Sequence, residues 1–203
     1  MFVKDCPHCD PHSSALSHLL KTTKNFYVVC DIHPLVEGHI LIIPKDHFPC
    51  VGAYPQKLFE EFLNLYHKAS AFLKKEYQVM SSFEHGVIGQ TVFHSHVHLL
   101  PFQGEPEIIV PEGQTNLIPI IQLASLLKTF KKEGKYLFFS IDRKMWLVQT
   151  SLGVPRFFRD RFARALGTPE RGDWKQMEQN QEIMKQAQED IIKLEKKWKN
   201  LYA

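Results

Sequence analysis

Three histidines at alternate positions, His94, His96 and His98, are the residues of this sequence best suited to chemistry. In an extended strand, alternate side chains point to one face, about 6.6 Å apart at a rise of about 3.3 Å per residue. Imidazoles on a buried face need polar partners, so such a row is costly to fold unless it has a function. The row predicts either a metal site or a site that attacks and holds phosphate.

The neighbours of the histidines favour phosphate. A catalytic metal usually has a carboxylate or a further histidine close by, whereas anion chemistry uses backbone amides with no nearby carboxylate. The residues directly before the row are Gly89, Gln90 and Thr91, and no carboxylate adjoins it. A zinc-dependent hydrolase with the three histidines as ligands, and a set of unrelated core histidines, are the alternatives.

A second group with ligand chemistry lies near the N-terminus, where Cys6 and Cys9 form a Cys-x-x-Cys pair. In a reducing compartment such a pair is half of a tetrahedral zinc site. A redox pair and two unrelated thiols are the alternatives.

The segment GQTVFHSHVHLLP, residues 89–101, resembles the signature of the histidine-triad (HIT) family, and only Ser95 departs from its apolar pattern. The segment DIHPLVEGHILIIPKDH, residues 31–47, is similar to the hairpin that precedes this signature in the family. The resemblance covers roughly residues 1–103.

This resemblance implies a nucleotide hydrolase or phosphoramidase. His96 would attack the α-phosphate of a nucleoside polyphosphate, a phosphoramidate or an adenylylated conjugate, and water would hydrolyse the resulting phosphohistidine. A third histidine at position 98 favours hydrolysis, because the transferase branches have Gln there. The other roles implied by position are a phosphate contact for His98, a fourth histidine near the site for His39, ribose binding for Asp31, a base contact for Ile32, and phosphate or leaving-group contacts for Gln90 and Thr91.

One departure from the family lies at Glu84, near the place where the phosphoramidase branch has Asn and the dinucleoside polyphosphate branch has Gln. The carboxylate leaves the choice of substrate open. The neighbouring His85 is either a donor to the phosphates or a cap of the loop. A non-catalytic module that keeps the fold and binds a nucleotide or RNA is therefore a further alternative.

Relatives with a similar Cys-x-x-Cys complete a zinc site with the histidine after Pro-Lys and the first histidine of the triad. The resemblance thus implies a structural zinc ion held by Cys6, Cys9, His47 and His94. It would pin the N-terminal segment to two strands. Alternative ligands are His8, His12 and Cys50.

These residues need strands and helices to position them. Apolar, β-branched runs predict a hairpin from residues 26–31 and 39–43, and apolar positions at helical spacing predict a helix over residues 56–77. Two further strands are expected at residues 78–84 and 91–101, with a tight loop between them. The second of these carries the three histidines.

Beyond Pro111 the pattern predicts helices over residues 117–132, 154–167 and 173–202, and a hairpin from residues 135–141 and 145–150. For the arginines at positions 156, 159, 161 and 164, a solvated basic face is favoured over a role in receiving phosphates or lining the substrate mouth. The prediction is an α+β fold. A HIT-like antiparallel sheet with flanking helices occupies residues 1–110, and a mixed α/β lobe ending in a long helix occupies residues 111–203.

Bulk composition limits the class of protein. A chain of 203 residues with 44% hydrophobic and 12% aromatic residues is typical of a folded protein. The net charge of +3 indicates neither a nucleic acid nor an anionic membrane as partner. There is no secretory signal and no apolar run of about 20 residues, so a cytoplasmic protein is expected. The family resemblance leaves a homodimer open.

Overall fold

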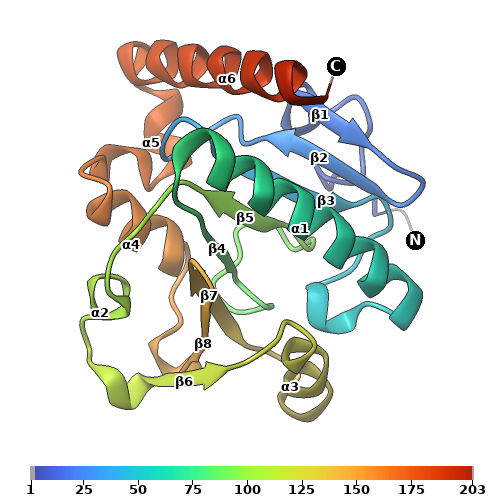
Figure 1. Ribbon diagram of the computed structural model, residues 1–203, viewed down its shortest axis with the longest axis vertical. Coiled ribbons are helices and arrows are strands. Elements are labelled where there is room, and N and C mark those ends of the chain that lie inside the picture. Colours follow the sequence, from blue (N-terminus) through green and yellow to red (C-terminus); the bar gives the residue numbers. More distant parts are fainter. Residues whose placement is uncertain (1–2, 203) are drawn as a thin grey trace.

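The computed structural model describes residues 3–202. Residues 1 and 2 of the predicted segment 1–110, and residue 203 of the predicted segment 111–203, lie outside it. Its strands form one eight-stranded sheet in the order β1-β2-β3-β5-β4-β7-β8-β6 (Figure 1). Every pairing of neighbours is antiparallel, which confirms the predicted class of sheet. The strands are β1 (Leu19–Thr22), β2 (Phe26–Cys30), β3 (Ile40–Pro44), β4 (Ser81–Glu84), β5 (Val97–Leu100), β6 (Leu117–Ile120), β7 (Leu137–Ile141) and β8 (Lys144–Val148).

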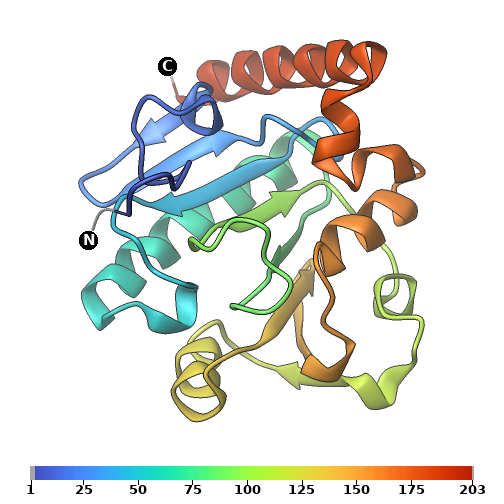
Figure 2. The ribbon, with the colours of Figure 1, turned by 180° about the vertical axis from the view of Figure 1, so that it is seen from behind.

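Helices cover both faces of the sheet. The longest two cross it on one side, α1 diagonally and α6 along the top of the view in Figure 1. From behind, α4, α5 and the N-terminal segment lie over the other face (Figure 2). The helices are α1 (Gln56–Tyr77), α2 (Pro106–Ile109), α3 (Ser125–Glu133), α4 (Phe157–Ala165), α5 (Trp174–Glu178) and α6 (Gln181–Tyr202).

Alternation along β5 sets the direction of His98. Val97 and Leu99 are buried in the same apolar cluster as Phe62 of α1. Leu100 instead joins a second cluster, on the opposite face, with residues of α4. Since successive side chains of a strand point to opposite faces, His98 lies on the face away from α1.

The second apolar cluster carries the C-terminal residues onto this face. Phe83 of β4 packs between the ring of His98, with centroids 4.2 Å apart, and the ring of Phe162 on α4, with centroids 5.1 Å apart. Phe83 also lies opposite Phe139 of β7 in the sheet. The pairing of β4 with β7 thus joins the N-terminal and C-terminal strands into one sheet. Helix α4 is thereby held beside the histidines.

The predicted helix over residues 117–132 is wrong in its first part. Residues Leu117–Ile120 form β6, which pairs with β8, and α3 begins only at Ser125. Pro119 has no N–H to donate to a ladder, but β6 is an edge strand, where a proline is tolerated. Strand pairing over a long sequence distance thus overrides the helical spacing.

The predicted strand over residues 91–101 is also shorter in the structure, because only Val97–Leu100 is a strand. Ser95 accounts for the difference: its N–H donates to the carbonyl of Phe48, and its buried hydroxyl bonds Glu84 Oε1 at 3.0 Å and the hydroxyl of Tyr54 at 2.8 Å. His94 and His96 therefore lie in irregular backbone before β5. The three histidines do not share one face of a strand.

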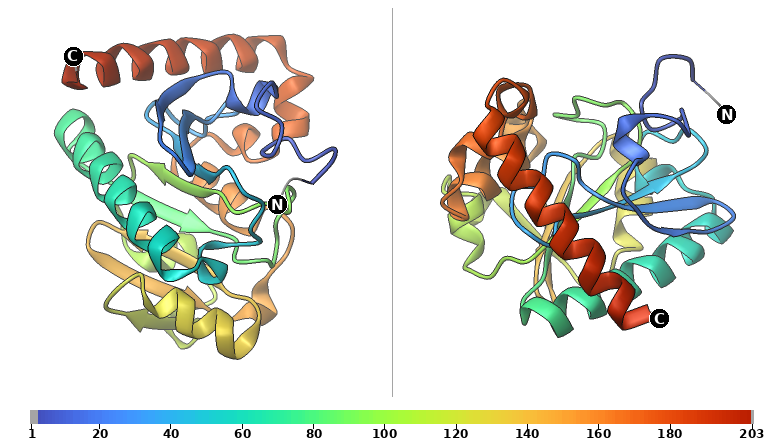
Figure 3. Two further views of the ribbon diagram at one scale, coloured as in Figure 1. Left: turned by 90° about the vertical axis from the view of Figure 1, so that its right-hand side faces the viewer. Right: turned by 90° about the horizontal axis from the view of Figure 1, so that it is seen from above.

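The predicted C-terminal helix over residues 173–202 is interrupted once. Asn180 Oδ1 accepts from the N–H groups of Glu182 and Ile183, at 3.1 and 3.2 Å, and so caps the start of α6 after α5. Helix α6 then crosses the sheet beside α1, as the side and top views show (Figure 3). Within residues 3–202, no helix combines the length and the apolar character needed to cross a bilayer.

Candidate active site

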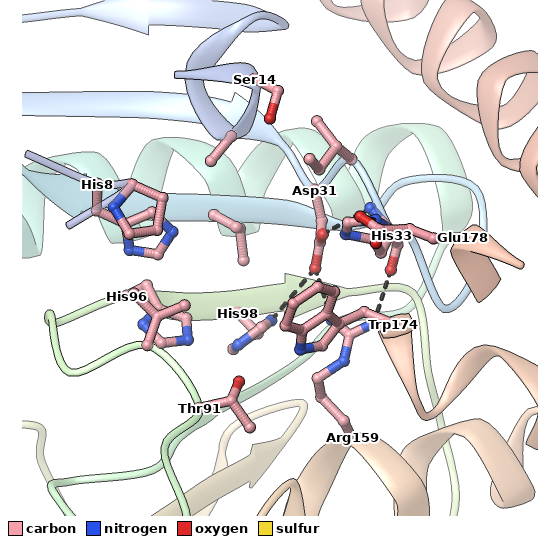
Figure 4. A pocket seen from close by; sticks show the side chains of 15 residues that line it. His8, Ser14, Asp31, His33, Thr91, His96, His98, Arg159, Trp174 and Glu178 are labelled. Atoms are coloured by element: carbon pink, nitrogen blue, oxygen red, sulfur yellow. Dashed lines mark hydrogen bonds and ion pairs between the residues drawn. The ribbon is translucent and has the colours of Figure 1, made fainter. Parts of the chain in front are cut away.

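A pocket of about 190 Å³ lies on the sheet face opposite α1 (Figure 4). Its walls come from the N-terminal segment, the β2–β3 hairpin, the histidine segment, α4 and α5. Of the residues predicted to bind or cleave a nucleotide, those that line it are Asp31, Ile32, Thr91, His96 and His98.

His96 has one ring nitrogen bound and the other available. Its Nδ1 lies 2.6 Å from the backbone carbonyl of His94, so Nδ1 carries the hydrogen and donates it. Burial lowers the pKa of His96, which keeps the ring neutral. A neutral imidazole with a fixed Nδ1–H presents the lone pair of Nε2, which is the form of histidine that attacks phosphorus.

A chain of hydrogen bonds fixes the tautomer of His98. The N–H of Leu35 donates to His39 Nδ1 at 3.1 Å, so His39 carries its hydrogen on Nε2 and donates it to His98 Nδ1 at 2.9 Å. His98 then carries its own hydrogen on Nε2, and that buried nitrogen has no partner among residues 3–202. Burial lowers the pKa of His39 to about 4 and that of His98 well below its ordinary value. His98 thus offers a neutral N–H donor.

Asp31 lies beside this chain. Its Oδ1 accepts from the N–H of His33 at 2.9 Å and its Oδ2 from Arg159 Nη1 at 2.8 Å. Burial raises the pKa of Asp31, but the guanidinium of Arg159 and the ring of His39 outweigh it and hold the pKa below its usual value. Oδ2 also lies 3.5 Å from His39 Nδ1 and 3.7 Å from His98 Nδ1. The sequence argument that no carboxylate lies near the histidines was therefore wrong.

Asp31, His39 and His98 also place ligand atoms close enough together for a metal ion. Arg159 already balances the charge of Asp31, and the two imidazoles are hydrogen-bonded to each other. A metal here would have to break that bond and would lie next to a buried guanidinium. This arrangement favours an anion over a cation.

The two cysteines meet two histidines behind the pocket. Cys6 Sγ and Cys9 Sγ each lie 3.4 Å from His94 Nδ1, and Cys9 Sγ lies 3.4 Å from His47 Nδ1. A tetrahedral zinc ion, with Zn–S about 2.3 Å and Zn–N about 2.0 Å, places nitrogen and sulfur about 3.5 Å apart. His94 Nε2 bonds the carbonyl of Pro44 at 2.8 Å, as ligating histidines usually do with their second nitrogen. The four side chains fit a metal of this kind.

These contacts also separate the three histidines of the row. His94 faces the sulfur atoms, whereas His96 and His98 line the pocket. Among residues 3–202, the three do not form a common group of ligand atoms, and neither His8, His12 nor Cys50 joins the group of four. The structure gives no support to a hydrolytic metal bound by the row.

Comparison with known proteins agrees with this geometry. The model of the HIT domain family matches residues 13–105, which include His39, His96 and His98. This part of the chain is similar to a HIT domain. An adenosine 5′-monophosphoramidase of Saccharomyces cerevisiae is 34% identical over 91 residues, which cover 44% of this chain and 56% of that protein.

Two other matches extend over almost the whole chain. The zinc finger CCCH domain-containing protein 64 of Arabidopsis thaliana is 25% identical over 94% of this chain and 35% of its own length. A hypothetical histidine triad nucleotide-binding protein of Sulfolobus tokodaii is 18% identical, with a TM-score of 0.46, over 97% of this chain and 93% of its own. The first curated relatives are matched over 35–55% of their length.

Residues beyond the segment that matches the HIT family model complete the pocket. Arg159 on α4 donates to Asp31, and its other nitrogens donate to the carbonyls of His33 at 2.7 Å and of Arg171 and Gly172 at 3.3 Å each. It is only 6% exposed, so the predicted solvated basic face was wrong at this position. Arg159 precedes the buried Phe162 by three residues, a helical spacing that places both on one face.

Helix α5 supplies two more lining residues that the sequence pattern does not reveal. The ring of Trp174 lies 5.6 Å from that of His33, and Glu178 Oε1 lies 3.1 Å from His33 Nε2. Both line the pocket, as Ile32 does. They are distant from the hairpin in sequence and form no motif with it.

Gln90 and His85 bond the backbone around the pocket instead of lining it. Gln90 Nε2 donates to the carbonyl of Pro49 at 2.8 Å. His85 Nε2 accepts from the N–H of Phe158 at 3.0 Å, in the first turn of α4. Burial lowers the pKa of His85 to about 3, so its ring is neutral and can accept this bond. The structure thus places His85 in the capping role.

Glu84, the departure from the family, is buried outside the pocket. It accepts from the N–H of Val51 at 2.9 Å, from Ser95 Oγ at 3.0 Å and from the hydroxyl of Tyr136. Burial raises the pKa of Glu84 to about 7, against these three bonds, which lower it. Glu84 therefore holds the histidine loop in place through Ser95.

The raised pKa of Glu84 makes stability depend on pH. The folded protein keeps a proton on Glu84 up to about pH 7, whereas the unfolded chain releases it near the ordinary value of 4.5. Stability from this group is thus present below pH 4.5 and is lost as the pH rises toward 7. The free energy of unfolding, measured with urea, is compared between Glu84→Gln and wild type at pH 5 and at pH 8. The difference is expected to shift in favour of the variant by roughly 2 to 3 kcal/mol between these two pH values. A difference that does not change with pH would contradict this prediction.

Proposed function

We propose that the protein is a hydrolase that cleaves at the α-phosphate of a nucleotide through a phosphohistidine on His96. One observation carries this proposal: Nδ1 of His96 is held by the His94 carbonyl at 2.6 Å, which leaves Nε2 free in a pocket that also contains His98. The similarity to an adenosine 5′-monophosphoramidase supports a nucleoside phosphoramidate as substrate. A nucleoside polyphosphate or an adenylylated conjugate would be cleaved at the same α-phosphate by the same chemistry.

In the first step, His96 Nε2 forms a bond to the α-phosphorus as the bond from phosphorus to the leaving oxygen or nitrogen breaks. The leaving group takes a proton from the surroundings and departs. His98 Nε2–H donates to a phosphate oxygen and stabilises the charge of the transition state. Asp31 accepts from the ribose hydroxyls, using lone pairs that remain beside its bonds to His33 and Arg159, and the base lies against Ile32.

In the second step, the oxygen of a water molecule bonds to the phosphorus of the phosphohistidine as the N–P bond breaks, and the water releases a proton to the surroundings. The nucleoside monophosphate leaves, and His96 returns to its neutral form. Thr91 lines the pocket at the phosphate end, and Gln90 keeps its loop in position.

We propose a structural role for Cys6, Cys9, His47 and His94 with a zinc ion. A bound zinc ion would connect three parts of the chain: the N-terminal segment through the two cysteines, the residues after β3 through His47, and the loop before β5 through His94. His94 ligates through Nδ1, while its backbone carbonyl accepts the hydrogen bond from His96. The zinc group and the nucleophile are therefore joined through a single residue.

Trapping the intermediate tests the reaction. Protein is mixed with an α-³²P-labelled adenosine nucleotide or phosphoramidate, and denatured within one turnover. We expect label on the protein that is labile in acid, stable in base and absent from His96→Asn. Labelling that persists in this variant would contradict the assignment of the nucleophile. Tight nucleotide binding with neither label nor turnover across a substrate panel would instead favour the non-catalytic module.

A further inference from the structure

His8, between the two cysteines of the N-terminal pair, lies in the same pocket as the nucleophile. Figure 4 shows its ring next to that of His96, and both line the pocket. The centroids of these two rings are 5.0 Å apart at an interplanar angle of 70°, and His8 is only 5% exposed. From the sequence, His8 was considered only as an alternative zinc ligand and not as part of the nucleotide site.

Nδ1 of His8 is buried and has no hydrogen-bond partner among residues 3–202. A buried ring nitrogen without a partner is unfavourable, because it loses its bond to water and gains none in return. His98 Nε2 is in the same condition. The ring of His98 also lies 5.0 Å from that of His96, so both unsatisfied imidazoles are neighbours of the nucleophile.

The ligand that suits this pair carries several acceptor oxygens around one atom. A phosphoryl group at His96 Nε2 directs its non-bridging oxygens outward, toward the rings that surround the nucleophile. A neutral imidazole donates one N–H, and a bond from it to a charged oxygen is among the stronger ones in proteins. A phosphate oxygen would therefore satisfy His8 as well as His98.

We propose that His8 is a phosphate-binding residue, which donates an N–H to a non-bridging oxygen of the α-phosphate while His98 contacts another. The identity of the ligand rests on the proposed function, whereas the contact itself does not require turnover. Cys6 and Cys9 then have a second effect besides binding metal. They hold His8, the residue between them, against His96.

Binding of AMP and of adenosine to the zinc-loaded protein, measured by calorimetry, tests this contact. His8→Phe keeps a ring against His96 but has no N–H, so AMP affinity is expected to fall about tenfold, while adenosine affinity stays unchanged. His8→Asn and His8→Gln restore a donor near the position of Nδ1 or of Nε2, and one of them should recover part of the loss. His12→Phe, which alters an exposed histidine of the same segment, is the matched control and should bind both as wild type does.

The remaining outcomes overturn the proposal. They are unchanged AMP affinity in His8→Phe, an equal loss for adenosine, no recovery in either amide variant, or a wild-type protein that binds AMP no better than adenosine. The zinc content of each variant is measured, so that a lost metal is not read as a lost contact. Wild-type protein that shows the expected binding pattern without any turnover would refute the hydrolase and leave the role of His8 standing.

Discussion

His96→Asn is expected to abolish hydrolysis, with a loss of about 10³-fold or more in kcat, while the fold and nucleotide binding stay nearly intact. The asparagine amide can donate to the His94 carbonyl as Nδ1 of His96 does, so the loop before β5 keeps its bond. What the variant lacks is the lone pair of Nε2. Because the lost interaction is made only in the reaction, the effect should fall on kcat and spare affinity.

Three measurements define this result: steady-state turnover, nucleotide affinity by calorimetry, and the midpoint of urea unfolding. His67→Asn is the matched control, because His67 is exposed on α1, across the sheet from the pocket. Activity in His96→Asn close to that of this control would show that another group attacks phosphorus. Loss of affinity together with a lower unfolding midpoint would show that His96 is mainly structural.

Removal of one sulfur ligand should have the second large effect. Cys9→Ser is expected to lose bound zinc and to lower the free energy of unfolding by about 3 to 5 kcal/mol, because a zinc ion that binds only the folded chain adds its binding energy to folding. Cys9 Sγ lies 3.4 Å from His47 Nδ1 and from His94 Nδ1, so its loss also removes a sulfur contact of both imidazoles.

Metal analysis and urea unfolding measure this effect. Cys30→Ala is the control, because Cys30 is a buried thiol outside the group of four and packs in the cluster under α1. A strong chelator should destabilise wild type and Cys30→Ala but leave Cys9→Ser unchanged. The structural zinc ion would be refuted if wild type contains no zinc and Cys9→Ser unfolds at the same urea concentration as Cys30→Ala.

Local patterns predicted the elements whose signals are local. The helix over residues 56–77 and the hairpin of β2 and β3 follow from apolar spacing and turn residues within a few positions. Residues 117–120 failed for the opposite reason. Their partner is β8, about 30 residues away. The spacing of their own apolar residues also fits a helix, so it does not reveal the pairing at the sheet edge.

The candidate site divides in the same way. Family positions pointed to His96, His98 and Asp31, which do line one pocket. The sequence favoured a solvated face for Arg159, and no motif linked Arg159 or Trp174 to the hairpin, because their partners there lie more than 100 residues earlier. Ser95 is the instructive case: the one polar residue in the apolar pattern bonds Glu84 and Tyr54, and the strand begins only after it, so that His94 and His96 lie outside β5.

The bond between Arg159 and Asp31 also constrains how this sequence can evolve. The carboxylate and the guanidinium are both buried, so neutralising either one leaves the other as an isolated charge, which proteins tolerate poorly. Arg159 further binds three backbone carbonyls, from both the hairpin and the turn before α5. Positions 31 and 159 are therefore expected to covary in descendants of this chain, so that Asp31, the proposed ribose-binding residue, is inherited together with Arg159.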